Sequence, residues 1–497
     1  MSSQPAAATL RSRASGGVVA WSYANRWILA IWSAIAIWAA GLFAIVRHEF
    51  VNFGTGRFDL GGMVQAVWST TQGRPLEVTN FSGDVVSRLG GHVDPILILF
   101  APLWLVAASP LTLLFVNVVC IALGALPVYW LARRHLGSEK PAALLGLAYL
   151  AYPWVGWAGI DAFHPMTLAI PLFLFCIWFL DTDRLWAFVP FALLALAAGE
   201  LMGVTLAALG IWYGLAHRRY SAGVGIAVAA IAWTLVAVYL IVPAASDGPS
   251  VFYGYYGSIG GSPEGVVKTA LTDPGAIASA LLSSRDVLYL FWLAAPLAGI
   301  FLLSRGLAAV AVPQLLTNVL SDNPAMTDPR DHYSAAAIPF LVAGTVLGAA
   351  RLRSSRKMFS ASLVLSLCAC CFVLLGPWPG APGNTPAWDS SVVPSDHAEV
   401  LRDAVAFVPD DAPVSATNRA GSHLSARRYF YSPLVVGNAE WIVLDMWDPF
   451  IDNPGFPVLE KDADALAAFR QRIEDSPRWT KIFEREGVLV FRKVSDS

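Results

Sequence analysis

The chain has 497 residues, of which 56% are hydrophobic and only 14% are charged, and its formal net charge is −2. Soluble proteins carry about 25% charged residues, so the composition excludes an ordinary soluble enzyme. The net charge argues neither for nor against nucleic acid, but no long basic run occurs and we expect no nucleic-acid partner. Apolar runs of membrane-spanning length recur from Trp27 to Leu375, which predicts a polytopic α-helical membrane protein.

The first long apolar run, Trp27–Val46, follows Arg11, Arg13 and Arg26. Basic residues prefer the cytoplasmic side, so we expect an uncleaved first span with a cytoplasmic N-terminus. Residues 1–20 are polar and rich in Ala and Ser, and they are expected to form a disordered cytoplasmic tail.

A polar loop, residues 47–95, separates this run from the next one, and loops of such length are more often functional than plain connectors. Within it, Leu60–Thr70 has the spacing of an amphipathic helix lying in the membrane interface, with Asp59 as N-cap or first-turn residue. The following run, Ile96–Ala107, is short and flanked by prolines, which favours a re-entrant or interfacial helix.

When that short run is not counted as a span, the basic residues of the later loops agree with a cytoplasmic placement. About eleven spans then lie within a transmembrane domain of residues 21–376, in the plasma membrane. After the first, they are expected at Leu111–Leu131, Pro141–Trp157, Pro165–Leu180, Leu185–Ala198, Leu201–Ala216, Val224–Val242, Val287–Leu303, Leu307–Leu320, Tyr333–Ala349 and Phe359–Leu375.

After the last span the composition becomes that of a soluble domain. Residues 377–395 form a linker rich in Pro, Gly and Trp, and residues 396–497 are expected to form a small extracytoplasmic α/β domain. No Walker pattern and no GxGxxG follows a strand, so the sequence shows no soluble nucleotide site. The elements expected are strands at Pro413–Ala416, Trp441–Leu444 and Val488–Phe491 and a helix at Asp462–Ile473.

This topology uses only hydropathy and basic residues, yet it places many acidic and histidine side chains on the outer face. Ionisable residues at a membrane edge are costly, and they therefore indicate function. The set is Asp59, His92, Asp94, Asp161, His164, Glu200, Asp322, Asp328, Asp331 and His332.

Asp59 lies between Phe58 and Leu60, and a carboxylate in apolar surroundings can act as a general base with a shifted pKa. The simpler interpretation is a helix N-cap, and one residue can fill both roles. Glu200 lies within a long apolar stretch, where an unpaired carboxylate is costly, so it either faces a polar cavity or caps a hairpin at the water boundary.

Two carboxylate–imidazole pairs are close in sequence: His92 with Asp94, and Asp161 with His164. Such pairs can bind a divalent cation or orient one another, and the alternative is that they anchor loops where spans begin. The candidate ligands of a divalent cation, Mg²⁺ or Mn²⁺, are Asp59, His92, Asp161 and His164.

Arg330 and His332 stand beside Tyr333 at the start of a span and could hold a lipid-linked phosphate, or all three could be an interfacial anchor. Arg57 is a further cation for such a phosphate. In the outer domain a cluster that follows the strand at Val414 could bind phosphate or sugar, or form a solvated loop: Asn418, Arg419, His423, Arg427 and Arg428.

Several segments resemble one family of predicted bacterial and archaeal membrane proteins, the domain-of-unknown-function family 2079, over most of Ala40–Val490. The residues that carry the resemblance are Phe58, Asp59, Leu60, Gly61, Gln65 and Trp68; Gly91, His92, Asp94, Pro95, Ala101 and Pro102; His164 and Pro165; His332, Tyr333, Pro339 and Phe340; and His423, Leu424, Ser425 and Arg427.

That family is similar in layout to the GT-C glycosyltransferases, which use polyprenyl-phosphate sugars and carry a catalytic Asp in the first outer loop. The resemblance implies that Asp59 activates an acceptor and that the sugar carbon is inverted. It also implies that a membrane lipid and a lipid-linked sugar donor are partners, with a glycan, lipid or protein as acceptor. Gln65, a motif residue, joins the expected substrate-binding set. No second acid is paired with Asp59, which leaves metal dependence open.

Two other functions compete with glycosyl transfer. A transporter or flippase of a lipid-linked sugar would place ionisable residues near the bilayer midplane and often shows internal repeats, whereas here the acids gather at one face. A non-catalytic scaffold would tolerate the replacement of Asp59.

Overall fold

The computed structural model describes residues 25–246, 251–281, 283–378, 380–382, 395–452 and 459–494. The expected tail, residues 1–20, and most of the expected linker, residues 377–395, lie outside these ranges. In the described part, helices dominate up to residue 375 and all strands except one short hairpin follow residue 413.

The first half of the helical part begins with one long helix and continues through short helical pieces around the polar loop. Its elements are α2 (Arg26–Val51), η1 (Arg57–Gly61), α3 (Gly62–Thr71), β1 (Glu77–Thr79), β2 (Val85–Ser87), η2 (Arg88–Gly90), η3 (Pro95–Phe100), α4 (Ala101–Val106), α5 (Pro110–Leu123), α6 (Ala125–Leu136), α7 (Glu139–Leu150), α8 (Pro153–Ile160), η4 (Pro165–Leu168), α9 (Ala169–Asp181), α10 (Leu185–Leu196), α11 (Met202–Ala216), α12 (Tyr220–Val236), η5 (Ala237–Ile241) and α13 (Val242–Ser246).

The second half contains shorter and more broken helices before a last long one. Its elements are η6 (Val251–Ile259), α14 (Pro263–Thr272), α15 (Pro274–Leu281), α16 (Ser284–Ala294), η7 (Ala295–Leu297), η8 (Ile300–Leu303), η9 (Ala308–Ala311), α17 (Val312–Val319), η10 (Pro324–Thr327), η11 (His332–Ser334), α18 (Ile338–Ala350) and α19 (Ser354–Leu375).

Four described helices are long and apolar enough to cross a membrane: Arg26–Val51, Pro110–Leu136, Tyr220–Ser246 and Ser354–Leu375. Two bent pairs raise the number to six, and six further apolar helices are shorter. The longest of these, Pro165–Asp181, has 17 residues, or roughly 25 Å at 1.5 Å per residue, which is less than the bilayer core. The expected count of about eleven spans therefore stays a prediction.

One expected span is interrupted. Within Val287–Leu303 the helix stops at Leu297, and Ala298 and Gly299 both take left-handed backbone conformations, with φ of 53° and 65°. Because L-residues avoid this region, Ala298 marks a real break in the helix rather than a gentle bend.

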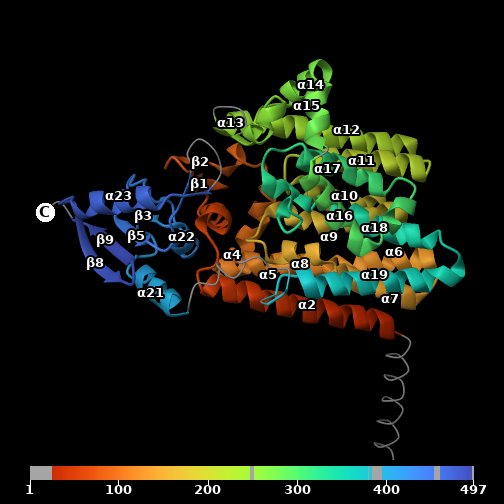
Figure 1. Cartoon of the computed structure of the whole chain (residues 1–497), viewed down its shortest axis with the longest axis horizontal. Helices are drawn as coiled ribbons and strands as arrows, with labels where there is room; N and C mark the ends of the chain where they lie inside the picture. Colours follow the sequence, from red (N-terminus) through yellow and green to blue (C-terminus); the bar gives the residue numbers. More distant parts are fainter. Residues whose placement is uncertain are drawn as a thin grey trace, which may run out of the picture.

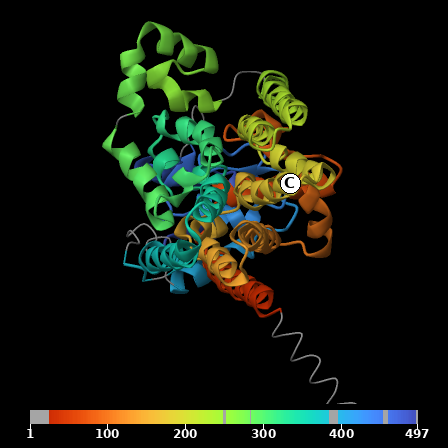
Figure 2. The ribbon, with the colours of Figure 1, turned by 90° about the vertical axis from the view of Figure 1, so that its right-hand side faces the viewer.

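The helices run side by side in a bundle, and the C-terminal strands form a separate body at one end of it (Figure 1). Viewed from the opposite end, α14 and α15 stand apart from the bundle (Figure 2). Large buried aromatic side chains fill the bundle core, among them Tyr129, Tyr149, Phe173 and Phe340. A second core, with Leu60, Leu97, Phe100 and Phe163, packs the polar loop onto the bundle end.

The C-terminal body is a five-stranded sheet with the order β4-β3-β5-β9-β8, in which β4, β3 and β5 are parallel and β9 and β8 are antiparallel. Alternate residues of β5 enter different cores on the two faces, since Val443 packs with α21 and α22 while Leu444 packs with α23. The elements are α21 (Ser395–Val405), β3 (Val414–Ala416), α22 (Asn418–Leu424), β4 (Phe430–Tyr431), β5 (Trp441–Asp445), β6 (Phe450–Asp452), β7 (Leu459–Lys461), α23 (Ala463–Glu474), β8 (Trp479–Arg485) and β9 (Val488–Lys493).

The helix expected to lie in the interface at Leu60–Thr70 is instead enclosed by protein. The structure has a π-helical turn, η1, followed by α3, and on α3 Met63, Gln65, Ala66 and Ser69 are all buried. The amphipathic spacing therefore did not predict the location of this helix. Its polar side is covered as well as its apolar side, because β1, α4 and the C-terminal body pack around it.

Candidate functional site

Asp59 lies on the π-helical turn η1, which the C-terminal body clamps from one side. A Cβ on Gly56 would lie 2.3 Å from Asn418 Nδ2, and one on Gly61 would lie 2.5 Å from Ser425 Oγ. Only glycine therefore allows α22 to approach this closely. The Phe58 amide donates to Asn418 Oδ1 at 2.9 Å, which fixes the turn. Single π-helical turns are frequent at functional sites.

The Asp59 carboxylate faces His164. Asp59 Oδ1 lies 3.3 Å from His164 Nε2, and the Asp59 side chain is 39% exposed while that of His164 is only 14% exposed. The pair thus joins a buried imidazole to a carboxylate that solvent reaches. No side chain caps η1 in the structure, so Asp59 does not act as its N-cap.

Asp161 and His164 face each other across a strained turn. Phe163 has φ of 49° although it is not glycine, and its side chain is fully buried against Phe100. The Ala162 amide donates to Asp161 Oδ1 at 2.9 Å, which leaves Oδ2 directed at His164 Nδ1, 3.3 Å away. Backbone strain of this kind persists only where the surroundings enforce it, and it clusters at functional sites.

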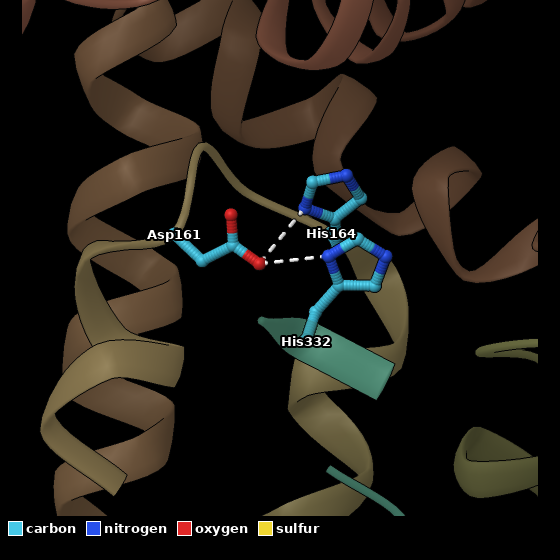
Figure 3. Close-up of side chains that lie close together, drawn as sticks. All are labelled: Asp161, His164 and His332. Atoms are coloured by element: carbon cyan, nitrogen blue, oxygen red, sulfur yellow. Dashed lines mark hydrogen bonds and ion pairs between the residues drawn. The ribbon is translucent and has the colours of Figure 1, made fainter. Parts of the chain in front are cut away.

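His332 completes the group from a third segment. Its Nδ1 lies 2.9 Å from Asp161 Oδ2, and its ring stacks on that of His164 with centroids 3.6 Å apart. Both Nδ1 atoms therefore point at the same carboxylate oxygen (Figure 3). We call Asp59, Asp161, His164 and His332 the His–Asp cluster.

The two histidines of the cluster have opposite pKa shifts. Burial would lower the pKa of His164, but the charges of Asp161 and Asp59 raise it to about 10. Burial and the neighbouring charge of His164 lower the pKa of His332. For Asp161, burial is outweighed by His164 and His332, which hold its pKa well below the ordinary range. Strongly shifted pKa values among neighbouring groups are frequent at functional sites.

A further carboxyl group, that of Asp331, adjoins the cluster. Burial and the charge of Asp161 raise the pKa of Asp331 to about 8. Arg330 is held by Asp328, with Nε–oxygen distances of 2.9 and 3.1 Å. The Tyr333 side chain is hydrogen-bonded to that of Tyr255, on the aromatic segment η6.

A second polar pair lies beside the cluster, and it uses Glu200. His92 Nδ1 is 3.4 Å from Glu200 Oε1, the Val93 amide donates to Oε2 at 3.1 Å, and the His92 ring stacks on Phe252. Burial opposes ionisation of Glu200, but the hydrogen bond and charge of His92 lower its pKa. His92 and Asp94 do not face each other, because Asp94 is buried against Arg88, with a shortest distance of 2.7 Å.

A family described as predicted membrane protein (DUF2079) matches residues 49–490. The chain belongs to this family. No curated protein matches it. Eight chains among the solved structures match. One is ArnT from Cupriavidus metallidurans bound to undecaprenyl phosphate, at 11% sequence identity and a TM-score of 0.49, covering 95% of this chain and 99% of that one.

In this DUF2079 protein, two of the expected substrate-binding residues lie between the polar loop and the C-terminal body. Arg57 is 4% exposed and donates to the carbonyl oxygens of Thr79 and Phe430 at 3.1 and 3.4 Å. Gln65 is 2% exposed and donates to the carbonyl oxygens of Arg427 and Arg428, both at 3.0 Å. Both side chains fasten the loop to the body.

The residues of the C-terminal body that were candidates for binding phosphate or sugar are mostly engaged within the protein. His423 lies between the rings of Phe50 and Phe53 and donates to the Phe50 carbonyl at 2.9 Å, and burial lowers its pKa to about 4. Arg427 is buried and donates to three backbone carbonyl oxygens. The Arg419 amide donates to Asp448, and only Arg428, beside Glu77, is largely exposed.

The residues that hold the cluster in place were not among the site residues predicted from the sequence. Thr167 Oγ1 donates to Asn117 Oδ1 at 2.8 Å and is 2.7 Å from the His164 carbonyl oxygen, which ties the strained turn to α5. Gln314 and Asn318 donate to the Tyr333 carbonyl oxygen at 3.2 and 3.1 Å. The available signal was the presence of amide side chains inside apolar runs, since a buried polar group needs a partner.

Three side chains of the cluster could hold a metal ion. The ligand atoms of Asp161, His164 and His332 all lie within 4.8 Å of one another. Of the four expected metal ligands, this group contains Asp161 and His164. Asp59 contacts the other ring nitrogen of His164, Nε2, and His92 faces Glu200.

Proposed function

We propose that this protein is an inverting GT-C-type glycosyltransferase that moves a sugar from a polyprenyl-phosphate donor to an acceptor outside the cytoplasm. The observation that carries the proposal is the position of Asp59: an accessible carboxylate held by a buried His–Asp cluster at one end of a membrane helix bundle. The acceptor is a glycan, a lipid or a protein of the cell envelope.

In the proposed reaction the acceptor hydroxyl gives its proton to Asp59. The acceptor oxygen forms a bond to the anomeric carbon while the bond from that carbon to the phosphate oxygen breaks, and the electron pair leaves on the polyprenyl phosphate. Asp59 suits the base because its carboxylate is 39% exposed and His164 orients one of its oxygens. The buried imidazoles nearby supply donors for the charge that develops on the leaving phosphate.

The lipid tail of the donor needs an apolar surface beside the cluster. The short helix Pro95–Val106 exposes Leu99, Leu105 and Val106, at 55%, 73% and 88%. On the other side η6 is fastened to the turn at Ser321, because the Asp322 amide donates to the Tyr255 carbonyl at 2.7 Å. These two segments are the proposed walls of the groove through which the tail enters.

The proposed orientation places the N-terminus in the cytoplasm and the C-terminal body outside the plasma membrane, with about eleven membrane crossings. Basic loops support it, because they meet at the bundle end away from the cluster: Arg134 and His135 both contact Asp181, and Arg219 contacts Asp183. The cluster and the C-terminal body then share the outer side, where an envelope acceptor is available.

The test is glycosyl transfer by purified protein in lipid, with a panel of radiolabelled polyprenyl-phosphate sugars, beside Asp59→Asn. Transfer by the wild type that disappears in Asp59→Asn supports the enzyme and its base. Donor binding without turnover by either protein contradicts the proposal and favours a carrier of lipid-linked sugar. Absence of donor binding removes the polyprenyl-phosphate donor from consideration.

A further inference from the structure

The His–Asp cluster has the donor set of a metal site. Two imidazole nitrogens and one carboxylate oxygen converge from two loops far apart in sequence, with Asp161 Oδ2 at 2.9 Å from His332 Nδ1 and 3.3 Å from His164 Nδ1. Metal–ligand bonds of about 2.0–2.2 Å place neighbouring ligand atoms about 3 Å apart or slightly more. These distances suit an ion, and the stacked rings of His164 and His332 would turn so that the ion lies in the plane of each.

One ligand atom lacks a regular partner. His164 Nδ1 is buried and is not aligned for a hydrogen bond with any group in the part of the chain that the structure describes, although Asp161 Oδ2 is near. A buried polar atom without a partner is costly. An ion seated between Asp161 and the two rings would satisfy this atom.

The ring nitrogen of His164 that faces away from Asp161 has the kind of partner that is usual for a metal-binding histidine. This nitrogen, Nε2, faces Asp59 Oδ1 at 3.3 Å. A carboxylate in this position keeps a proton on that nitrogen and directs the opposite lone pair toward a metal. Asp59 can do this with one oxygen while the other remains open to an acceptor.

Negative charge also favours a cation here. Two carboxylates, Asp59 and Asp161, belong to the cluster and contact its imidazoles. The nearest guanidinium of the loop that carries His332, Arg330, is engaged by Asp328. A divalent cation would offset this excess of carboxylates in a site of low dielectric constant.

We propose that Asp161, His164 and His332 bind one divalent first-row transition ion of the Zn²⁺ type. Two imidazoles and one carboxylate favour such an ion over Mg²⁺, which prefers oxygen ligands. This proposal differs from the expected Mg²⁺ or Mn²⁺, and it has His332 in place of His92. On binding, the ion displaces the proton from His164 Nδ1. Its role as an electrophile beside the leaving phosphate rests on the proposed function, but its binding does not.

The experiment measures Zn²⁺ in full-length protein purified in lipid nanodiscs through a tag without histidines, by elemental analysis after equilibration with limiting Zn²⁺ and dialysis. The wild type is expected to retain about one equivalent. Asp161→Asn and His332→Ala are expected to bind at least about tenfold more weakly. His92→Ala is the matched control: a histidine at the same end of the bundle, outside the cluster, whose loss leaves the bound Zn²⁺ unchanged.

A second readout separates ligation from misfolding. The Co²⁺ form of the wild type is expected to show visible absorption bands that shift in Asp59→Asn, which alters the outer contact of His164 but removes no ligand. Equal Zn²⁺ in all variants, or none in the wild type, overturns the proposal. Transfer activity in a metal-free protein rejects the electrophilic role of the ion and keeps the transferase. Zn²⁺ bound at the cluster without any transfer keeps the metal site and rejects the transferase.

Discussion

The two ends of the helix bundle each contain a buried aspartate paired with histidine, yet their surroundings differ. At the basic end, Asp181 contacts His135 at 2.8 Å and Arg134 at 3.0 Å, and the two cationic side chains are 32% and 53% exposed. At the other end, Asp161 contacts His164 and His332, which are only 14% and 15% exposed.

The difference lies in how each carboxylate is neutralised. A guanidinium that reaches solvent carries a permanent charge, so Asp181 is matched at every ordinary pH. Imidazoles are charged only when they are protonated. The negative charge of Asp161 is therefore balanced by groups whose own charge also depends on two further carboxyl groups, Asp59 and Asp331. The first arrangement is suited to anchoring a loop, and the second to chemistry.

The contrast between the two ends of the bundle requires that they lie on opposite sides of the membrane. In a chain whose five native cysteines are replaced by serine, Ala467→Cys on the exposed face of α23 should react with a membrane-impermeant maleimide in intact cells. Ser138→Cys, exposed before α7, should react only after the cells are opened. Labelling of both positions from one side would contradict the proposed orientation.

Replacing one aspartate at each end tests which end carries the chemistry. Asp59→Asn keeps the shape but removes the base, so transfer should fall by about 10²–10⁴-fold, the range for general-base catalysis. Asp181→Asn at the basic end should leave transfer per folded molecule unchanged. Initial rates with radiolabelled donor measure both. Equal losses would mean that the effect is one of folding.

Ion pairs at the two ends should differ in their contribution to stability. Arg88 and Asp94 are 13% and 3% exposed, so Arg88→Gln leaves a buried charge unpaired and should destabilise the protein by about 3–5 kcal/mol. At the basic end Arg133 and Glu139 are 59% and 35% exposed, and Arg133→Gln should cost about 0–1 kcal/mol. Unfolding in mixed micelles of increasing SDS content measures the two. Similar losses would show that burial does not distinguish these ends.

The smallest expected effect comes from His423. Burial lowers its pKa, whereas neighbouring aspartates raise the pKa of His164. The pKa of His423 is lowered from 6.5 to about 4 in the folded protein. Below pH 6.5 the unfolded chain therefore takes up a proton that the folded chain does not, and stability should fall by about 2 kcal/mol on going to pH 5.

The full contribution of neutral His423 is present above its unfolded pKa and is lost as the pH falls. His423→Phe retains an aromatic ring between Phe50 and Phe53 and should reduce this pH dependence. Protease resistance of the C-terminal body at pH 7 and pH 5 compares the two proteins. A wild type that is equally resistant at both values would show that His423 carries its proton when buried.

The long apolar helices could be predicted from the sequence, because a helix forms its backbone hydrogen bonds within itself and needs no distant partner. The run at Trp27–Val46 is the core of α2, and the run at Phe359–Leu375 lies in α19. The burial of α3 could not be predicted in this way. It depends on carbonyl oxygens of Arg427 and Arg428, more than 360 positions away.

For the site, the spacing Asp-x-x-His correctly indicated that Asp161 and His164 lie together, because a short turn allows few alternatives. Their contacts with Asp59 and His332 come from segments that only the folded bundle brings together. The left-handed backbone of Phe163 carries no signal in the sequence, since this residue type avoids that region. Arg57 and Gln65 have the polarity of binding residues, and burial under the C-terminal body gives them another role.

The clamp of α22 on η1 has a consequence for synthesis. The partners Phe58 and Asn418 stand 360 positions apart, so the turn that carries Asp59 leaves the ribosome long before the helix that holds it. Until the last part of the chain has been made and folded, Gly56 and Gly61 lack their neighbours on α22 and Gln65 lacks its acceptors. A chain that is cut short before α22 can still insert its helices, but its Asp59 turn is never assembled.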